Sequence, residues 1–266
     1  MRFPHFPAVP DSPTIFPDID PKRRFGGLER LYGEETIACL KTARVAVVGI
    51  GGVGCWVAEA LARSGVGMLR LIDPDNLVES NINRQIHALD DTLGQAKVTA
   101  MAARIHRIHP QCRVETVEDF LTPENVATLL TDLDLVVDAI DDVRAKTAIA
   151  VHCRQTRLTL LMAGGAGGKT DPRRIRVGDL AYTTQDPLLS RVRARLRREH
   201  GFTREPGKKF GIEAVTSDEP LRRPPACITN NGPHGLSCAG YGSSMAMTAS
   251  IGLFIAARAL EQLLRT

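Results

Sequence analysis

Residues 44–73 constrain the fold of this chain more than any other stretch. Residues 45–48 are a short apolar run, typical of a strand that is buried on both faces. A G-x-G-x-x-G pattern follows directly, at Gly49, Gly51 and Gly54. Residues 57–62 then continue as an apolar helix, and residues 68–72 form a second apolar run. This order predicts a βαβ unit whose first turn contains the glycines.

The glycines and the acid after the second strand have the spacing of a nucleotide site. Glycines let the backbone approach phosphate groups, and the start of the helix adds free N–H donors and the positive end of its dipole. Asp73 lies about 20 residues beyond the glycines, where a carboxylate accepts hydrogen bonds from a ribose. The alternative is that the glycines serve only close packing of the helix on the strand. We expect nucleotide binding at this turn.

The length and composition fit one large α/β domain or one such domain with an insertion. The chain has 266 residues, of which 43% are hydrophobic and 24% charged, which is ordinary for a soluble globular protein. A net charge of +4 identifies no partner by itself. Six cysteines without a C-x-x-C pair argue against a four-cysteine zinc site or a disulfide framework, and favour a reducing cytoplasm.

The first residues differ in composition from the rest of the chain. Residues 1–21 contain six prolines and no apolar segment of the kind that signal peptides carry. We therefore expect residues 1–22 to be a flexible, Pro-rich tail and residues 23–266 to form a single domain.

Glycines interrupt the segment that follows this tail. Gly26, Gly27 and Gly33 predict short pieces, with a helix over residues 34–41. Arg24 and Arg30 flank the glycine pair, and the simplest interpretation is that both are solvated surface residues.

Further strands and helices alternate after the first βαβ unit. Strands are predicted over residues 114–118, 133–138 and 158–162, and helices over residues 97–109, 123–130 and 143–156. Because crossovers between parallel strands are right-handed, this alternation predicts an α/β fold with a doubly wound, mostly parallel, Rossmann-like sheet. Residues 163–172 form a glycine-rich loop, in which the backbone can approach a ligand or a neighbouring sheet closely.

Polar side chains follow the second strand, at the rim where ligands bind in such sheets. Asn81, Arg84 and Gln85 lie just past this strand, and Lys97 opens the next helix. Arg84 and Lys97 could simply be solvated. Charge-assisted contacts from arginine and lysine are, however, the usual partners of a triphosphate.

Carboxylates gather where the fourth predicted strand ends. Asp138, Asp141 and Asp142 lie in the sequence VVDAIDD, on the same rim. Carboxylates beside a triphosphate suit Mg²⁺, which prefers oxygen ligands. The alternative is that Asp142 caps the following helix; both hold if Asp141 binds the metal and Asp142 is the cap.

The segment from residue 169 to about residue 225 is a basic insert. Residues 169–223 contain 14 lysines and arginines against 8 acids, which is a net charge of +6. A helix is predicted over residues 186–200, and residues 205–225 are predicted to be a mobile loop. On this helix Arg191, Arg195 and Arg198 share one face. A solvated amphipathic helix is one interpretation, and contact with RNA or DNA phosphates is the other.

The C-terminal segment, residues 226–266, contains an apolar helix and two cysteines. Residues 245–260 are too few for a membrane span and include Arg258, so we expect a helix buried against the sheet or in a dimer interface, and no stable membrane association. Cys227 and Cys238 lie in a polar, loop-like context, where an exposed cysteine can be a nucleophile, although most such cysteines are not.

Four motifs in this order give the chain a family resemblance. GIGGVG, LIDPDNLVESNINRQ, GQAK and VVDAIDD resemble the ubiquitin-activating-type adenylating enzymes, the family of MoeB, ThiF and HesA. The resemblance implies an ATP site formed by Gly49, Gly51, Gly54, Asp73, Asn81, Arg84 and Lys97. It also implies that Arg84, Lys97 and Asp141 act in catalysis and that Asp141 holds Mg²⁺.

The resemblance further implies a homodimer, because this family donates an arginine from the partner subunit. The corresponding motif here is RFGG, in which Arg24 fits the first arginine of the family pattern and Gly27 occupies the place of the second. Arg30 is a possible substitute.

Within the family, the chain is similar to the branch that dehydrates threonylcarbamoyladenosine in tRNA. RFGGLERLYG, NRQIHAL, GGAGGK, the arginine-rich QDPL helix and the cysteine-bearing C-terminal segment carry this similarity. The implied reaction is an ATP-dependent cyclisation beside the tRNA anticodon, with tRNA as partner. A sulfur-relay protein is a further possible partner.

Other classes of function remain open at this point. An adenylyltransferase for a ubiquitin-like sulfur carrier would use the same site, although the basic insert and the absence of C-x-x-C pairs argue against it. An NAD-binding oxidoreductase would leave Arg84, Lys97 and Asp141 without a triphosphate or a metal. A purely structural interaction protein fits least.

Overall fold

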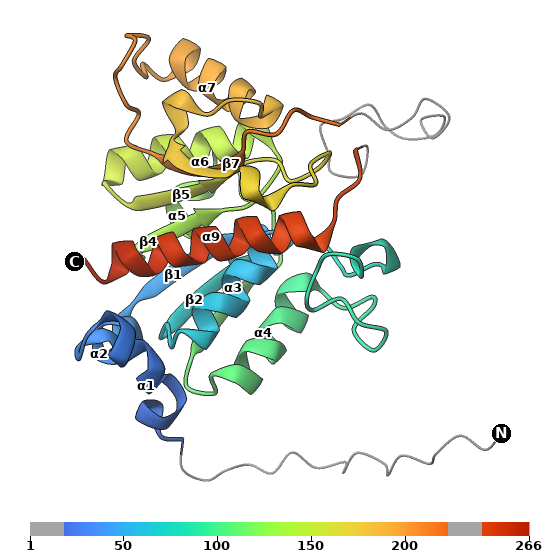
Figure 1. Ribbon diagram of the computed structural model, residues 1–266, viewed down its shortest axis with the longest axis vertical. Helices are drawn as coiled ribbons and strands as arrows, with labels where there is room; N and C mark the ends of the chain where they lie inside the picture. Colours follow the sequence, from blue (N-terminus) through green and yellow to red (C-terminus); the bar gives the residue numbers. More distant parts are fainter. Residues whose placement is uncertain (1–18, 223–240, 266) are drawn as a thin grey trace, which may run out of the picture.

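The computed structural model describes residues 19–222 and 241–265 and is built around one twisted sheet (Figure 1). Its strands are β1 (Arg44–Val48), β2 (Met68–Ile72), β3 (Arg113–Val117), β4 (Leu135–Asp138), β5 (Thr159–Ala163), β6 (Ile175–Asp179) and β7 (Glu213–Ser217). Their order is β3-β2-β1-β4-β5-β7-β6. All neighbours pair in parallel except β6 and β7, which are antiparallel. The predicted α/β class with a doubly wound, mostly parallel sheet is confirmed.

Helices cover both faces of the sheet and enclose a separate apolar core on each face. The helices are α1 (Pro21–Tyr32), α2 (Thr36–Thr42), α3 (Gly54–Arg63), α4 (Lys97–Ile108), α5 (Val126–Leu129), α6 (Val143–Thr156), α7 (Pro187–Glu199) and α9 (Met245–Leu263). Helices α3, α4 and α9 pack on one face, and α5, α6 and α7 on the other. Strands β1 and β4 lie between the two cores, which explains why they read as continuous apolar runs.

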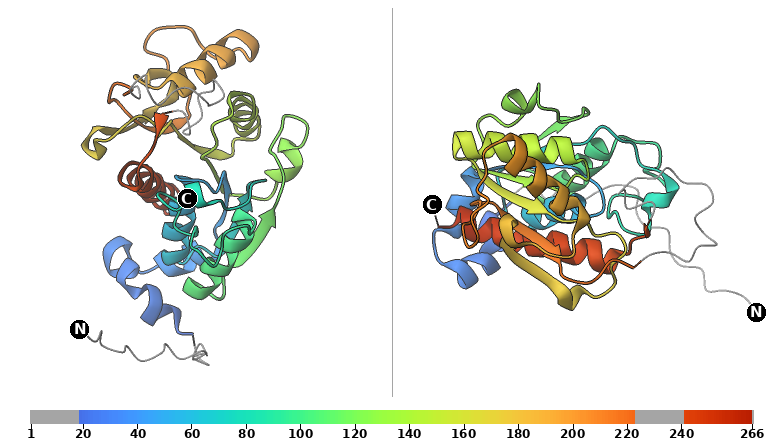
Figure 2. Two further views of the ribbon diagram at one scale, coloured as in Figure 1. Left: turned by 90° about the vertical axis from the view of Figure 1, so that its right-hand side faces the viewer. Right: turned by 90° about the horizontal axis from the view of Figure 1, so that it is seen from above.

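The C-terminal helix α9 lies against the sheet, which is one of the two positions predicted for it; the other was a dimer interface. In the left view of Figure 2 this helix is seen along its axis, beside the sheet. It packs on α3 so closely that a Cβ at Gly252 would lie 2.7 Å from the Val53 carbonyl oxygen. Ile251 and Ile255 of the same helix are fully buried in the core on this face of the sheet. No helix in the described ranges is long and apolar enough to cross a membrane.

The basic insert belongs to the sheet, which corrects one prediction. The mobile loop predicted for residues 205–225 contains β7, which pairs with β5 on one side and β6 on the other. Ala214 and Val215 of β7 are fully buried. This short apolar pair outweighs the surrounding Pro, Gly and charged residues because it completes both cores at once.

The chain start also differs from its prediction. The first helix, α1, begins at Pro21 and runs through Gly26 and Gly27, where short pieces were expected. Asp20 caps it by accepting from the backbone N–H groups of Lys22 and Arg23, and proline is well suited to the first helical position. Phe25 anchors the helix, because its buried ring meets the His109 ring edge-on at 4.9 Å. The predicted tail therefore extends two residues too far; residues 1–18 lie outside the described ranges.

The buried side chain of His87 affects how the stability of the fold depends on pH. It is 2% exposed, and neither ring nitrogen has a hydrogen-bond partner among the described residues. Burial lowers the pKa of this imidazole to about 4, and the positive charges of Lys97 and Arg104 act in the same direction. The folded protein therefore holds His87 neutral at pH values where an unfolded chain already protonates it.

We predict that this histidine makes the free energy of unfolding fall as the pH drops from 6.5 to 4. The folded pKa lies below the unfolded value of about 6.5, so the unfolded state binds the extra proton and the total loss is about 3 kcal/mol. Urea titrations of the wild type and of His87→Leu between pH 4 and pH 7.5 measure this difference. The variant should lose less stability in this window, whereas His106→Gln, at an exposed histidine, should behave like the wild type. Equal pH dependence in the wild type and His87→Leu would contradict the prediction.

Candidate active site

A cavity of about 560 Å³ opens at the carboxyl ends of the parallel strands. It is lined by the ends of β1, β2, β4 and β5 and by the loops that follow β2 and β3. Six side chains or backbone segments predicted from the sequence meet there: Gly51, Asp73, Asn81, Arg84, Lys97 and Asp141. Residues that are up to 90 positions apart thus form one surface because parallel strands end at the same edge.

The three glycines have different roles in the turn after β1. Gly49 adopts a φ of +87°, and a Cβ there would lie 2.9 Å from the Ala139 carbonyl oxygen. A Cβ at Gly54 would lie 1.8 Å from the Gly49 oxygen, so α3 can pack on the turn only through a glycine. Gly51 faces the cavity, with no described atom within 4 Å of its Cβ position. Close packing therefore explains Gly49 and Gly54 but not Gly51, whose open position leaves room for the phosphate approach expected from the sequence.

Asp73 lies under the turn and is 6% exposed. Its Oδ2 accepts from the Ile50 N–H at 2.7 Å, and its Oδ1 accepts from the Asp75 N–H at 2.9 Å. Burial raises the pKa of this carboxyl group, and the positive charge of Lys97 opposes the shift. A carboxylate oxygen has more than one lone pair, so this group can still accept from a ribose hydroxyl.

The loop after β2 presents Asn81 and Arg84 to the cavity. Asn81 is buried and organises a tight turn, because its Oδ1 accepts from the Val78 N–H at 3.2 Å and its backbone oxygen accepts from the Arg84 N–H at 3.1 Å. The indole N–H of Trp56, on α3, donates to the Arg84 backbone oxygen at 3.0 Å. The guanidinium of Arg84 donates to the Ser80 backbone oxygen at 2.7 Å and remains half-buried at the cavity wall.

Lys97 is the first residue of α4 and is 6% exposed. Its Nζ lies 2.6 Å from Asp75 Oδ2 and 3.6 Å from Asp73 Oδ1. Its backbone N–H donates to the Asp75 oxygen at 3.0 Å, which ties the two ends of the Asn81–Arg84 loop together. The lysine therefore brings a buried positive charge to the cavity beside the two aspartates.

The three aspartates at the end of β4 and just after it lie in three different environments. Asp138 is fully buried and pairs with Lys146 at 2.9 Å. Asp142 accepts from the Ala145 N–H at 2.7 Å, so its predicted role as the cap of α6 is confirmed. Asp141 is exposed and lines the cavity. No three His, Cys, Asp or Glu side chains within residues 19–222 and 241–265 are grouped as a metal site.

Several cavity residues were not identified from the sequence. The loop after β3 contributes residues 119–124, and its Glu124 pairs with Arg144 of α6 at 3.0 Å. Leu188 of α7 and Thr248 of α9 also line the cavity. Apolar and hydroxyl side chains of this kind occur throughout the chain, so nothing in the sequence distinguished them. The glycine-rich loop after β5, by contrast, did signal close approach, and its residues 164–166 line the cavity.

The remaining predicted residues lie elsewhere. Arg24 donates to the Ile108 backbone oxygen at 2.6 Å, and neither it nor Arg30 lines this cavity. On α7, Arg195 and Arg198 pair with Glu199 at 2.7 and 2.6 Å. Arg191 on the same helix is exposed. Cys227 and Cys238 lie outside the described residues.

Comparisons with known proteins agree with this geometry. The sequence matches the ThiF family over residues 26–265. It is 42% identical to the tRNA threonylcarbamoyladenosine dehydratase of Haemophilus influenzae over 95% of this chain and 98% of the relative. The crystal structure of the tRNA N6-threonylcarbamoyladenosine dehydratase of Escherichia coli in complex with ATP superposes with a TM-score of 0.84 at 44% identity, and covers 92% of this chain and 95% of that one. The AMP complex of the same enzyme gives a TM-score of 0.83, with the same identity and coverage.

The family match extends through the basic insert and the C-terminal helix, beyond the four motifs of the nucleotide site. The chain therefore belongs to the ThiF family.

Proposed function

We propose that this chain catalyses the ATP-dependent dehydration of N6-threonylcarbamoyladenosine beside the anticodon of tRNA, through an acyl-adenylate. The observation that carries the proposal is the near full-length similarity to dehydratases whose crystal structures contain ATP and AMP. The convergence of Gly51, Asp73, Asn81, Arg84, Lys97 and Asp141 on one cavity supports it.

The first chemical step activates a carboxylate, which is a poor electrophile because oxide is a poor leaving group. A carboxylate oxygen of the threonyl group attacks the α-phosphorus of ATP, the bond from that phosphorus to the bridging oxygen breaks, and pyrophosphate leaves. Arg84 and Lys97 stabilise the charge that moves onto pyrophosphate. We expect Gly49, Gly51 and Gly54 to shape the phosphate turn and Asp73 to hold the ribose.

We propose that Asp141 holds Mg²⁺. Mg²⁺ is commonly bound by one or two carboxylates together with substrate phosphates, so a single exposed carboxylate at the cavity fits this mode without a cluster of protein ligands. The ion would supply charge stabilisation on the phosphate oxygens.

The second step closes a ring within the modified nucleoside. A nucleophilic atom of the same side chain attacks the activated carbonyl carbon, and AMP leaves with the former carboxylate oxygen. The neutral nucleoside thereby loses one water: the oxygen leaves in AMP, one hydrogen is the proton that the carboxyl group has already lost as a carboxylate, and the other is the proton released by the nucleophile. Because both groups belong to one molecule, positioning supplies much of the acceleration.

The basic insert is the proposed contact for tRNA. Helix α7 buries Leu189, Val192 and Leu196, and leaves Arg191 and Arg198 exposed on the outside of the fold. We further propose a homodimer, in which Arg24 or Arg30 of one copy reaches the other copy's cavity, and a cytoplasmic location, where tRNA is available. Cys227 or Cys238 as a nucleophile and a sulfur-relay protein as partner remain hypotheses.

The alternative function is adenylation of the C-terminus of a ubiquitin-like sulfur carrier. Its chemistry would use the same cavity. An insert with a net charge of +6 is better suited to nucleic acid, and the two substrates separate the alternatives directly.

We predict that the purified protein releases AMP from ATP and Mg²⁺ with tRNA that carries the threonylcarbamoyl group, and not with tRNA that lacks it. The nucleoside should lose the mass of one water. When the substrate carboxylate is labelled with ¹⁸O, mass spectrometry should find one label in AMP. AMP formation with a ubiquitin-like carrier and with neither tRNA would instead establish the alternative.

A second prediction concerns the residues at the phosphates. Arg84→Ala and Asp141→Ala should each reduce ATP–pyrophosphate exchange by roughly 100-fold to 1000-fold, because each removes charge stabilisation that is strongest in the transition state. Asp90→Ala serves as the control, since this exposed acid lies in the same loop as Arg84 and does not line the cavity. Full exchange in either cavity variant would refute its proposed role.

A third prediction concerns α7. The double variant Arg191→Ala, Arg198→Ala should bind all tRNAs more weakly. The dependence of log affinity on log salt concentration should also flatten, by about one unit for each phosphate that the helix no longer neutralises. Arg107→Ala, at an exposed arginine of α4, is the matched control. An unchanged salt dependence in the double variant would show that these arginines do not contact phosphates.

A further inference from the structure

The order of the strands gives the cavity two chemically different ends. Strands β2 and β3 lie on one side of β1, and β4 and β5 lie on the other. A nucleotide whose ribose meets Asp73, at the end of β2, and whose phosphates meet the turn after β1 occupies the first side. The end of the cavity beyond β4 is therefore left for the second substrate.

Two segments that are distant in the sequence form this second end. One wall is the turn after β5, with Gly164, Gly165 and Ala166. The other wall is Leu188, in the first turn of the basic helix α7. The distance between these walls decides what the cavity accepts at this end.

A single buried carboxylate joins the two walls. Asp186 is 3% exposed and precedes α7 as its N-cap. Its Oδ2 accepts from the Gly165 N–H at 2.8 Å and from the Thr216 hydroxyl at 2.7 Å, while its Oδ1 accepts from the Leu189 N–H at 2.9 Å. One side chain thus fixes the turn after β5, strand β7 and the start of α7 relative to each other.

The Asp186 carboxylate lies so close to the turn after β5 that no side chain fits at position 164. A Cβ at Gly164 would lie 2.2 Å from Asp186 Oδ2 and 2.5 Å from the Thr216 hydroxyl oxygen. The glycine at this position is therefore explained by the approach of the carboxylate to the turn.

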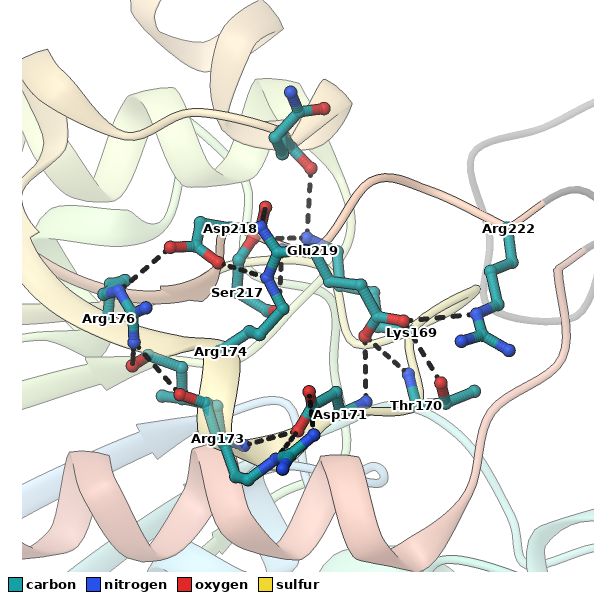
Figure 3. A network of polar contacts seen from close by, with 12 residues as sticks. Lys169, Thr170, Asp171, Arg173, Arg174, Arg176, Ser217, Asp218, Glu219 and Arg222 are labelled. Atoms are coloured by element: carbon teal, nitrogen blue, oxygen red, sulfur yellow. Dashed lines mark hydrogen bonds and ion pairs between the residues drawn. The ribbon is translucent and has the colours of Figure 1, made fainter.

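A neighbouring network, which contains Lys169, Ser217 and Glu219 (Figure 3), also holds the residue before Asp186. The ammonium of Lys169, 3% exposed, donates to the backbone oxygens of Gln185 and Ser217 at 3.0 and 2.6 Å. Glu219 in turn accepts from the Thr170 N–H at 2.8 Å. Because β5, β7 and the start of α7 are held by several buried contacts, Asp186 has one defined position.

We propose that Asp186 is a positioning residue that sets the end of the cavity for the threonylcarbamoyl group and aligns it with the tRNA-binding helix α7. This inference rests on the function proposed above. Asp186 does not touch the reacting atoms; it acts through Gly165 and Leu188. Its loss should therefore affect the reaction of the modified tRNA and leave ATP binding unchanged.

The test uses the substitution Asp186→Ser in the full chain. Serine is a good N-cap and keeps an acceptor for the start of α7, but it is too short to reach the Gly165 N–H. Asp179→Ser is the matched control, because Asp179 also accepts from backbone N–H groups within the insert, those of Ala181, Phe210 and Gly211, but none of these donor residues lines this cavity, whereas Gly165 does. The measurements are the Kd for ATP, the Kd for unmodified tRNA and kcat/KM for AMP release with threonylcarbamoylated tRNA.

We expect kcat/KM with the modified tRNA to fall roughly 10-fold to 100-fold in Asp186→Ser, as small displacements of a positioned substrate do. Both Kd values should stay at those of the wild type, and Asp179→Ser should match the wild type in all three. An unchanged kcat/KM, or an equal loss of ATP affinity, would overturn the inference.

Thr216→Val provides a second, milder variant, which decides the question if Asp186→Ser does not fold. It removes only the hydroxyl that donates to Asp186 Oδ2 and should give a smaller loss of the same kind; a wild-type kcat/KM in this variant would count against the inference. A wild type that releases no AMP with modified tRNA refutes the proposed function itself. An active wild type with unaffected variants refutes only the role of Asp186.

Discussion

The position of the cavity rim depends on the contacts that the buried ammonium group of Lys146 makes with two neighbouring strands. It is fully inaccessible to solvent, and its Nζ lies 2.9 Å from Asp138 Oδ1 and 2.9 Å from the Ala163 backbone oxygen. One side chain of α6 thus joins the carboxyl ends of β4 and β5. A buried charge is tolerated only when it is paired and hydrogen-bonded, so each of these partners depends on the others. The rim residues that follow the two strands, Asp141 and Gly164, are set by this contact.

Some of the acidic residues around the cavity have structural roles, and one is available for chemistry. Asp73, Asp142 and Asp186 all accept hydrogen bonds from backbone N–H groups and thereby fix turns and helix starts. Asp138 compensates the buried lysine. Asp141 and Asp142 are both exposed at the cavity, but Asp142 caps α6, whereas the oxygens of Asp141 are left accessible to a metal ion and to phosphates. The same residue type therefore serves as a cap, a counter-ion or a candidate ligand, according to burial and available donors.

The basic insert is integrated into the sheet, and this has a functional consequence. Strands β6 and β7 extend the sheet, and α7 packs beside α6 over the second core. A guanidinium–ring contact reinforces this packing, since the guanidinium of Arg154 lies 4.3 Å above the Phe202 ring centre. A surface that binds RNA on α7 would therefore hold a fixed orientation relative to the cavity, which an appended mobile loop could not provide.

The sequence by itself determined the local features of this protein. Periodicity and glycine spacing predicted the first five strands and the glycine turn, and placed Asn81, Arg84, Lys97 and Asp141 on the rim, because each of these signals can be read from a short stretch of sequence. Only the tertiary structure decided how distant segments meet: β7 inside the sheet, Leu188 and Thr248 in the cavity, and Asp186 between two walls. These positions follow from packing and buried hydrogen bonds between residues far apart in the chain, and no local pattern records such partners. The charge of the insert was visible in the sequence, but its rigid attachment was not, because two buried residues of β7 outweigh a composition that otherwise favours a loop.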